Sequence, residues 1–289
     1  MKVLVIGFGS VGQRHAENAL ALGHDVIAYD TVANKQPNGW DIDYVGSEFD
    51  AWKWEPTAVI IASPTSTHAP YLYRAIANGI RLVLVEKPIA LSVGELSALA
   101  CLGGVRVSVG YNLRFHDGLR AFKQRLYGKT PVTASFVCRC NKAAWPGASY
   151  ADMLLEGSHE IDAALWSLGP ATVIGASGYG DRWTILLKHA SGCVTTVVLD
   201  GAYSGQPERT IEVSTEQDTF RHETTTGTRW RWKITASDTE AEAGTVYAFS
   251  MYRQELADFL SERNGCASFD DGLAVLNICD RARIAAARS

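Results

Sequence analysis

The sequence has no long apolar run and no excess of positive charge. Its 289 residues carry 27 Lys and Arg against 31 Asp and Glu, a formal net charge of -4. A bilayer-spanning helix needs about 20 consecutive apolar residues, and nucleic-acid-binding surfaces are normally basic. The composition therefore predicts neither membrane insertion nor nucleic-acid binding.

Cysteine is present without the spacing that metal or redox chemistry needs. The six cysteines form no C-x-x-C pair. Cys138 and Cys140 alternate on a predicted strand, so they share a face but are not spaced like zinc ligands. We predict reduced, mostly buried thiols and no metal site. Reduced thiols are typical of the cytosol, which favours a cytoplasmic protein.

The length allows two domains, and the pattern changes near residue 118. Before it, strands alternate with helices, which predicts a parallel sheet with right-handed crossovers. The predicted strands are Lys2–Ile6, Val26–Tyr29, Ala58–Ala62, Leu82–Val85 and Val105–Val109, and the predicted helices are Val11–Leu22, His68–Asn78 and Ser92–Cys101. Residues 33–56 show no helical period, so we expect one crossover helix to be reduced to a loop.

The second part, 119–289, is predicted to be an α+β domain with an antiparallel or mixed sheet and a helix on one face. Its predicted strands are Val132–Cys140, Ala171–Ser177, Trp183–Lys188, Val194–Leu199 and Arg209–Thr215. Its predicted helices are Leu119–Tyr127, Tyr150–Leu168, Tyr247–Glu262 and Asp271–Arg288. We expect the last helix to be able to pack back on the first domain, 1–118.

A glycine turn follows the first predicted strand and opens the first predicted helix. It reads Gly7, Phe8, Gly9, Ser10, Val11 and Gly12. In such a turn the first glycine permits the tight bend, the second lets the backbone approach a pyrophosphate, and the third lets helix and strand pack closely. Asp30 ends the second strand, where its carboxylate can bind ribose hydroxyls and would repel a 2′-phosphate. We predict NAD binding, and NADP is the less favoured cofactor.

A second polar segment follows the strand Ala58–Ala62 and leads into a helix. Four of its residues are predicted to contact the cofactor, because ligands bind at the carboxyl ends of parallel strands: Ser63, Pro64, Thr65 and His68. Thr67 has two interpretations that can hold together, a helix N-cap and a ligand contact.

The next strand, Leu82–Val85, ends in Glu86, Lys87 and Pro88. A lysine at the end of a buried strand is costly to place, since desolvation disfavours its charge. Its ammonium is predicted to point into the crevice that holds the dinucleotide. We therefore predict that these three residues contact the cofactor and that Lys87 also handles a proton of the substrate, which points to hydride transfer.

Two further segments carry candidate site residues. Asn112 and Arg114 follow the strand Val105–Val109, where Arg114 could bind an anionic or hydroxylated substrate; the alternative is a hinge segment whose polar groups satisfy the backbone. On the predicted helix Tyr150–Leu168, Glu156 lies three residues before His159, on the face that also carries Asp152. Such a pair suits general acid–base chemistry and substrate binding.

These motifs, in this order, resemble the glucose–fructose oxidoreductase / inositol dehydrogenase (Gfo/Idh/MocA) family over essentially the whole chain. The resemblance implies an open, mostly antiparallel second sheet that often serves as a dimer or tetramer interface. It implies Lys87 as the catalytic lysine and His159 as the acid/base histidine. Many members place an aspartate four residues before that histidine, where this chain has Leu155 and carries Glu156 instead.

The resemblance further implies a dehydrogenase of carbohydrate metabolism that interconverts a secondary alcohol and a ketone on a sugar, sugar nucleotide or cyclitol. Glu156 or Asp162 would orient His159. Three alternatives stay open: reduction of a C=N bond, as in imine and thiazoline reductases; a cofactor-sensing regulator without catalysis; and NAD-dependent glycoside hydrolysis, which no leaving-group site supports.

Overall fold

The computed structural model describes residues 1–32, 42–99, 104–144, 152–225, 229–237 and 239–288. The chain forms two compact units. Unit 1 comprises Met1–Asn112 and Tyr252–Leu273, and unit 2 comprises Leu113–Met251 and Ala274–Ser289. The boundary predicted after residue 118 lies close to the first passage between the units, and the chain later returns to unit 1 for one segment.

Unit 1 is built on a seven-stranded sheet with the order β15-β6-β5-β4-β1-β2-β3. All neighbouring strands are parallel except the pair β15 and β6. The strands are β1 (Lys2–Ile6), β2 (Asp25–Tyr29), β3 (Asp43–Val45), β4 (Ala58–Ile61), β5 (Leu82–Glu86), β6 (Arg106–Gly110) and β15 (Ala267–Ser268). The alternation of strands and helices predicted this parallel sheet, to which the antiparallel strand β15 is added at one edge.

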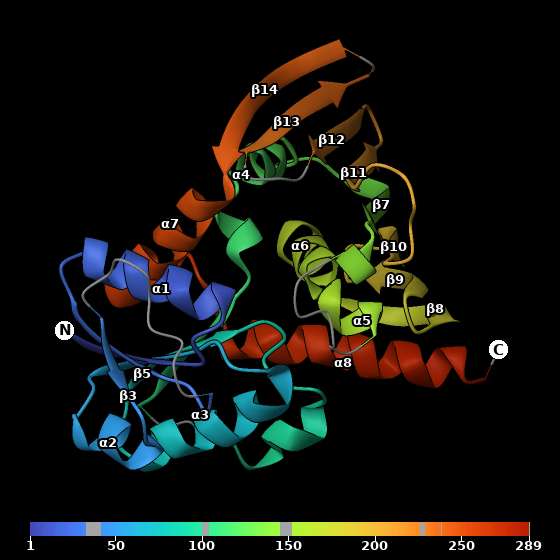
Figure 1. The fold of residues 1–289 in the computed structure, drawn as a ribbon. Helices are drawn as coiled ribbons and strands as arrows, with labels where there is room; N and C mark the ends of the chain where they lie inside the picture. Colours follow the sequence, from blue (N-terminus) through green and yellow to red (C-terminus); the bar gives the residue numbers. More distant parts are fainter. Residues whose placement is uncertain (33–41, 100–103, 145–151, 226–228, 238, 289) are drawn as a thin grey trace. The chain divides into compact units, whose positions relative to one another are not determined.

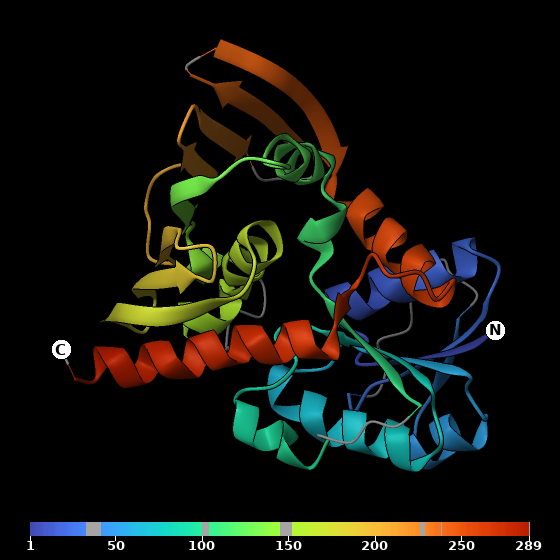
Figure 2. The ribbon, with the colours of Figure 1, turned by 180° about the vertical axis from the view of Figure 1, so that it is seen from behind.

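Helices cover both faces of this sheet, which explains its uniformly apolar central strands. Every residue of β4 and β5 is buried. Helices α1 (Ser10–Ala21) and α7 (Ala248–Leu260) lie on one face, and α2 (Glu48–Lys53) and α3 (His68–Ala77) on the other (Figures 1 and 2). The unit also contains the 3₁₀ helices η1 (Thr65–Thr67) and η2 (Val93–Leu99). A third 3₁₀ helix, η3 (Asn112–Phe115), begins at the last residue of unit 1 before the chain enters unit 2.

Two local predictions for unit 1 are wrong. Residues 33–56 are not all loop, because β3 and α2 lie within them; residues 33–41 fall outside the described residues. Helix α2 has only six residues, too few to show a period, and its start is marked by Ser47, whose hydroxyl accepts the Asp50 N–H at 3.1 Å. The helix expected at Ser92–Cys101 is 3₁₀ over Val93–Leu99, and residues 100–103 lie outside the description.

Unit 2 contains an eight-stranded sheet with the order β14-β13-β12-β11-β7-β10-β9-β8. Only β7 and β10 pair in parallel, so the sheet is mostly antiparallel as predicted. The strands are β7 (Pro131–Arg139), β8 (Ala171–Tyr179), β9 (Arg182–His189), β10 (Val194–Asp200), β11 (Glu208–Thr215), β12 (Thr219–Thr225), β13 (Arg229–Ala236) and β14 (Thr239–Tyr247). The last three were not predicted, because their threonines and charges obscure an apolar alternation.

Helices of unit 2 pack on the buried side of its sheet. Helix α4 (Asp117–Arg125) contacts β12, β13 and β14, and α6 (Ser158–Leu168) contacts β7 and β10 (Figure 1). The other helices are η4 (Lys142–Ala144), the short α5 (Met153–Glu156) and α8 (Phe269–Ala286), whose residues from Ala274 onward belong to this unit. In β9, buried and exposed residues alternate strictly, as expected for a sheet with one packed face.

The single helix predicted over Tyr150–Leu168 is instead broken at Gly157. Asp152 is the N-cap of α5, and α6 begins at Ser158, so Asp152, Glu156 and His159 do not share one helical face. A Cβ on Gly157 would lie 2.6 Å from the Leu199 side chain, so a larger residue here would have to displace that buried leucine.

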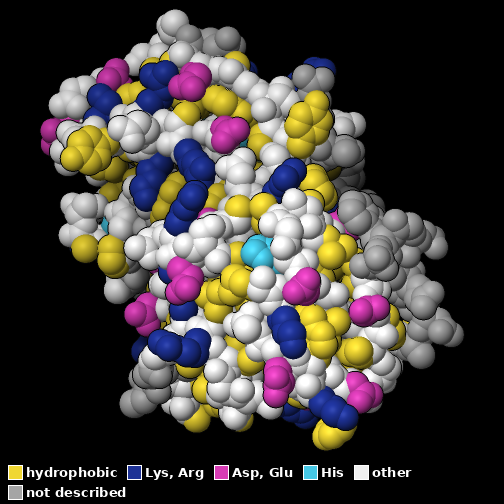
Figure 3. Space-filling view, turned by 90° about the vertical axis from the view of Figure 1, so that its left-hand side faces the viewer, with side chains coloured by type: hydrophobic (Ala, Val, Ile, Leu, Met, Phe, Trp, Pro, Cys, Tyr) yellow, Lys and Arg dark blue, Asp and Glu magenta, His cyan; other side chains and the backbone are white. Residues whose placement is uncertain are grey.

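The surface carries charges of both signs. Basic and acidic side chains occur among one another on the face drawn in Figure 3. Arg221 of β12 binds Glu212 of β11 across the strands and Glu223 within its own strand, and Lys233 of β13 binds Glu223 across the strands. Within the described ranges, no helix has the length and hydropathy needed to cross a bilayer.

Candidate functional site

The glycine turn of unit 1 is held by backbone contacts that leave no room for side chains at two of its positions. Gly7 has φ of 89°, and a Cβ there would lie 2.5 Å from the Ser63 backbone. A Cβ on Gly12 would lie 1.9 Å from the Gly7 carbonyl oxygen. A Cβ on Gly9 would have no other atom within 4 Å. The turn is therefore tight beneath the helix and open at Gly9.

The start of α1 and the end of β2 are joined by Asp30. Its Oδ2 accepts the Phe8 N–H at 2.8 Å and its Oδ1 accepts the Val32 N–H at 3.0 Å. A carboxylate oxygen can accept more than one hydrogen bond, so Asp30 is suited to bind a ribose as well as this backbone. Helix α1 has Gly9 as its N-cap, which brings no capping side chain, and its first N–H groups can serve an anion.

A cavity of about 110 Å³ opens beside this turn, at the carboxyl ends of β1, β2 and β4. It is lined by Ile6, Gly7, Tyr29, Asp30, Thr31, Ser63, Pro64, Thr67 and Tyr71. Burial raises the pKa of Tyr71 to about 12, so its hydroxyl is neutral at physiological pH. A carboxylate, hydroxyls and glycine backbone beside a helix start suit the ribose and phosphates of a dinucleotide. Tyr29, Thr31 and Tyr71 were missed, since isolated aromatics and threonines carry no motif.

The polar segment after β4 divides between this cavity and the interior. Ser63 and Pro64 line the cavity, whereas Thr65 is buried. Both ring nitrogens of His68 lie 2.8 Å from carbonyl oxygens, Nδ1 from that of Pro88 and Nε2 from that of Ser63. Burial lowers the pKa of His68, so the ring is neutral near pH 7 and donates its single proton to one of the two. Its predicted contact with a cofactor stays a prediction.

Thr67 does not act as a side-chain cap. It occupies the N-cap position of α3 without a side-chain hydrogen bond to the helix. Its hydroxyl donates to the Pro64 carbonyl oxygen at 2.7 Å and lies 2.7 Å from the Ser63 hydroxyl. Thr67 is therefore the N-cap residue of α3 by position, without a capping side chain, and its contact with a ligand stays a prediction.

Glu86, Lys87 and Pro88 continue β5 at the same sheet edge. Glu86 is the last residue of the strand and is buried, and Lys87 is partly exposed. The Lys87 N–H donates to Glu86 Oε2 at 3.2 Å, and Glu86 Oε1 lies 2.7 Å from His15 Nε2. The peptide bond between Lys87 and Pro88 is cis. Strand β5 pairs with β4, and the residues that follow β4 line the cavity. Lys87 therefore follows the strand adjacent to β4.

In unit 2, Arg114 forms a buried ion pair with Asp162. Its Nε lies 3.0 Å from Oδ2 and a terminal nitrogen lies 2.6 Å from Oδ1, a two-pronged arrangement. The two side chains are 7% and 2% exposed. Arg114 and Asp162 are therefore paired with each other. A contact of Arg114 with substrate stays a prediction, as does one of Asn112, which is buried in unit 1.

Helix α6 presents His159 on its first turn, partly exposed, directly after the break at Gly157. Glu156, also partly exposed, is the last residue of α5. On either side of α6 an acid is buried in an ion pair, Glu160 with Arg209 of β11 and Asp162 with Arg114. Glu160 was missed, because a buried acid on a helix has no signature without its partner.

Two histidines lie in the interior of unit 2, and neither was predicted to be a site residue. The rings of His116 and His222 are 5.5 Å apart, edge to face. The pKa of His116 is lowered to about 3 by burial and by the neighbouring His222 and Arg209. The pKa of His222 is lowered to about 4 by burial and by Arg209. Both rings are therefore neutral at pH 7.

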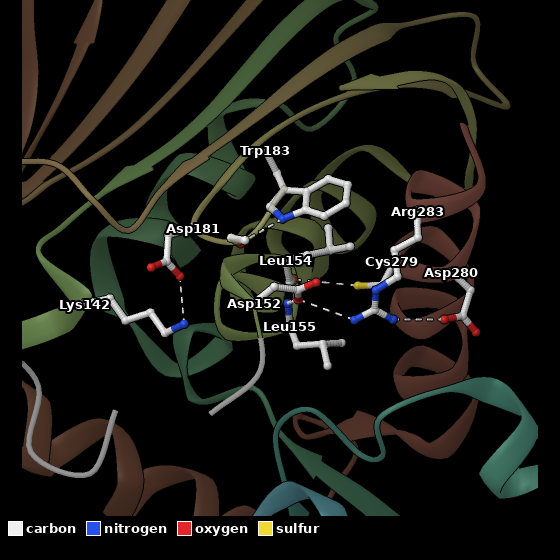
Figure 4. A network of polar contacts seen from close by, with 10 residues as sticks. Lys142, Asp152, Leu154, Leu155, Asp181, Trp183, Cys279, Asp280 and Arg283 are labelled. Atoms are coloured by element: carbon white, nitrogen blue, oxygen red, sulfur yellow. Dashed lines mark hydrogen bonds and ion pairs between the residues drawn. The ribbon is translucent and has the colours of Figure 1, made fainter. Parts of the chain in front are cut away.

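The segment that leads into α6 is tied to α8 (Figure 4). Asp152 Oδ1 lies 3.4 Å from both the Leu155 N–H nitrogen and an Arg283 nitrogen, and Arg283 also binds Asp280 at 3.3 Å. The Cys279 thiol lies 3.8 Å from the Leu154 carbonyl oxygen. Lys142 binds Asp181 at 2.8 Å on the opposite side of the same segment. The contacts of Asp152 and Leu154 hold α5 in place before the chain reaches His159.

The described cysteines are free thiols. Cys138, Cys140, Cys193, Cys266 and Cys279 are buried and form no disulfide, while Cys101 lies outside the described residues. Burial raises the pKa of the Cys279 thiol to about 12, which keeps it protonated. Hydrogen bonding from Cys138 lowers the pKa of Cys140.

The parallel sheet, glycine turn and edge cavity define unit 1 as a dinucleotide-binding α/β fold. Residues 1–111 match the family model "Oxidoreductase family, NAD-binding Rossmann fold" (GFO_IDH_MocA). Residues 1–111 thus match the Gfo/Idh/MocA oxidoreductase family, whose Rossmann fold binds NAD.

Curated relatives and solved structures agree with this family. The chain is 30% identical over 159 residues to inositol 2-dehydrogenase 4 of Saccharopolyspora erythraea, covering 48% of this chain and 46% of the relative. It is 29% identical over 205 residues to scyllo-inositol 2-dehydrogenase (NAD(+)) of Bacillus subtilis, covering 62% and 57%. The chain thus spans about half the length of these relatives.

Among solved structures, the fold is similar to UDP-N-acetylglucosamine 3-dehydrogenase from Acidithiobacillus ferrooxidans. The TM-score is 0.83 at 21% identity, and the match covers 99% of this chain and 97% of the other. At this identity the likeness concerns the fold.

Proposed function

We propose that the protein is an NAD(H)-dependent dehydrogenase that interconverts a secondary alcohol and a ketone on a cyclitol, sugar or sugar nucleotide. The observation that carries the proposal is the carboxyl edge of the unit 1 sheet. At this edge the cavity beside the glycine turn opens at the ends of strands, and Lys87 directly follows another strand of the same parallel sheet. The relatives named as inositol dehydrogenases support the substrate class.

In the proposed reaction, the residues of this chain bind, orient and move a proton. Asp30 and the glycine turn hold the nucleotide, and bound NAD supplies the hydride acceptor. His159 takes the hydroxyl proton as the C–H bond gives up its hydride, so the alcohol carbon becomes a carbonyl carbon. Lys87 donates a hydrogen bond to the same oxygen and stabilises its developing negative charge. Glu156 braces His159 or contacts the substrate.

Turnover of a substrate panel tests this function. Inositols, free sugars and nucleotide sugars are each offered with NAD and with NADP, and nicotinamide absorbance is followed. We expect turnover with NAD, and a loss of about 10²-fold or more for Lys87→Ala, since acid–base help is worth about 10² to 10⁴ in rate. Lys53→Ala, an exposed lysine of unit 1, is the matched control and should keep full activity.

Each outcome of this panel decides between functions. Undiminished turnover in Lys87→Ala would remove Lys87 from the chemistry. Silence of the wild type on all alcohols, with cyclic imines reduced, would replace the proposal by C=N reduction. Silence on both, with NADH bound tightly, would favour a cofactor-sensing protein.

A further inference from the structure

Lys87 lies between Glu86 and Pro88, and a buried histidine contacts each of these two neighbours. His15, fully buried on α1, contacts Glu86 at 2.7 Å, and His68, 1% exposed on α3, contacts the Pro88 carbonyl oxygen at 2.8 Å. Neither histidine has a direct role in the hydride transfer proposed above.

The contact of His15 with Glu86 reaches the lysine backbone. Glu86 uses Oε1 for His15 and Oε2 for the Lys87 N–H, at 3.2 Å. Its carboxylate is also confined by Gly110, where a Cβ would lie 2.9 Å from Oε2. A carboxylate removed from water needs hydrogen-bond donors, and His15 and Lys87 provide them.

Helix α7 closes this cluster from the other side. The Tyr252 ring meets His15 edge to face at 5.5 Å, and the fully buried Glu255 contributes a carboxylate oxygen within 4.8 Å of the ligand atoms of His15 and Glu86. His15 is thus packed on several sides, which restricts its ring to one orientation toward Glu86.

Each histidine also belongs to an element that carries a predicted cofactor contact. His15 lies on the helix that the glycine turn opens. His68 contacts, through its second nitrogen, the carbonyl oxygen of Ser63, which lines the edge cavity. The two histidines therefore connect the lysine segment to the two turns that flank the cavity.

We propose that His15 and His68 are positioning residues, which fix the backbone on both sides of Lys87 relative to the turns that hold NAD. The proposal rests on the proposed function. Its physical basis is that a reacting group displaced by about 1 Å can lose about 10²-fold in rate, and that a side chain acting on substrate needs rigid support from the residues around it.

A variant series at His15 tests the proposal. His15→Leu removes the donor to Glu86, and His15→Gln keeps an N–H group near the position of Nε2. We expect kcat to fall about 10- to 100-fold in His15→Leu, with KM for NAD little changed, and to recover largely in His15→Gln. An unchanged kcat in His15→Leu would overturn the proposal.

The Lys87→Ala background separates positioning from general damage to the fold. If His15 acts through Lys87, His15→Leu has little further effect once the lysine side chain is gone. An equal loss of kcat in both backgrounds would assign His15 to folding alone and overturn the proposal. If His15→Leu does not fold, Glu86→Gln replaces it in the series. The amide has one acceptor oxygen in place of two, so either His15 or the Lys87 N–H loses its acceptor. An unchanged kcat in Glu86→Gln would also overturn the proposal.

A measurement without substrate distinguishes failure of this proposal from failure of the proposed function. The rate at which an amine-reactive reagent labels Lys87 is followed by peptide mass spectrometry, with Lys53 as internal control. We expect His15→Leu to change labelling at Lys87 only and His15→Gln to restore it. Equal labelling in all variants overturns the positioning role, even if the enzyme turns over no alcohol.

A chelator gives the last control, because His15, Glu86 and Glu255 are close enough to share a cation. We expect dialysis of the wild type against the chelator to leave Lys87 labelling unchanged. A change that zinc reverses would make the cluster a metal site and overturn the proposal.

Discussion

Gly9 and Gly12 belong to one turn but have different structural roles. Gly12 packs against the Gly7 carbonyl oxygen, where a Cβ would lie at 1.9 Å. Gly9 faces open space and has φ of -73° and ψ of -169°, a conformation any residue can adopt. The absence of a side chain thus serves the fold at Gly12 and the ligand at Gly9.

We therefore expect opposite results from two alanine variants. Gly9→Ala should unfold at the same denaturant concentration as wild type but bind NADH more weakly, since its methyl group occupies the space in front of the turn. Gly12→Ala should lose stability, because its Cβ clashes with backbone. Calorimetric titration with NADH and denaturant unfolding measure the two effects, with Gly46→Ala, also in open space, as control. Wild-type affinity in Gly9→Ala would contradict this division.

At the scale of elements, α6 is held by buried acids on two sides. Glu160 pairs with Arg209 from the sheet, and Asp162 pairs with Arg114 from the segment before α4. Because an ion pair in the interior has a defined geometry, these contacts set the rotation of the helix and with it the direction of His159. The N-cap at Asp152 and its link to α8 set where the preceding α5 begins (Figure 4).

Breaking the Arg114 pair should cost far more than breaking a surface pair. Asp162→Asn leaves the buried guanidinium without its counter-charge, and we expect the free energy of unfolding to fall by about 3 kcal/mol. Glu212→Gln, which removes one partner of the exposed Arg221, should cost less than about 1 kcal/mol. Denaturant unfolding measures both. A loss in Asp162→Asn no larger than in the control would show that the buried pair does not anchor α6.

At the scale of the whole molecule, acid should destabilise the fold through its buried histidines. His116 and His222 have folded-state pKa values of about 3 and about 4, below the ordinary 6.5. Between those values and 6.5 the unfolded chain binds more protons than the folded chain. The free energy of unfolding must therefore fall as the pH falls through this range.

We expect the loss to reach about 1.4 kcal/mol per pH unit for each histidine at its steepest. Guanidinium unfolding followed by tryptophan fluorescence at pH 7, 6 and 5 measures it, and Trp230 lies 5.8 Å from His116 as a local reporter. His222→Gln should remove one histidine's share of the slope. An identical slope in that variant would mean that His222 is not neutral in the folded state.

Much of unit 1 could be predicted from sequence, because its signals are local. Steric demands of the glycine turn, apolar strands and helix stops act within a few residues. The strand and helix alternation predicted the sheet and placed Asp30, Ser63 and Lys87 at its carboxyl edge. Local reasoning failed where elements are short or polar, as at α2 and β12, and at Gly157, where a larger residue would have to displace Leu199, far along the chain.

The sequence by itself thus determined the dinucleotide turn, the parallel sheet around it and the strand end that carries Lys87. Only the tertiary structure decided the partners of the buried charges. Arg114 and Asp162 are 48 residues apart, and His15 and Glu86 are 71 apart. Such pairs follow from which faces pack together, and the cost of burying a charge selects them only after the chain has folded.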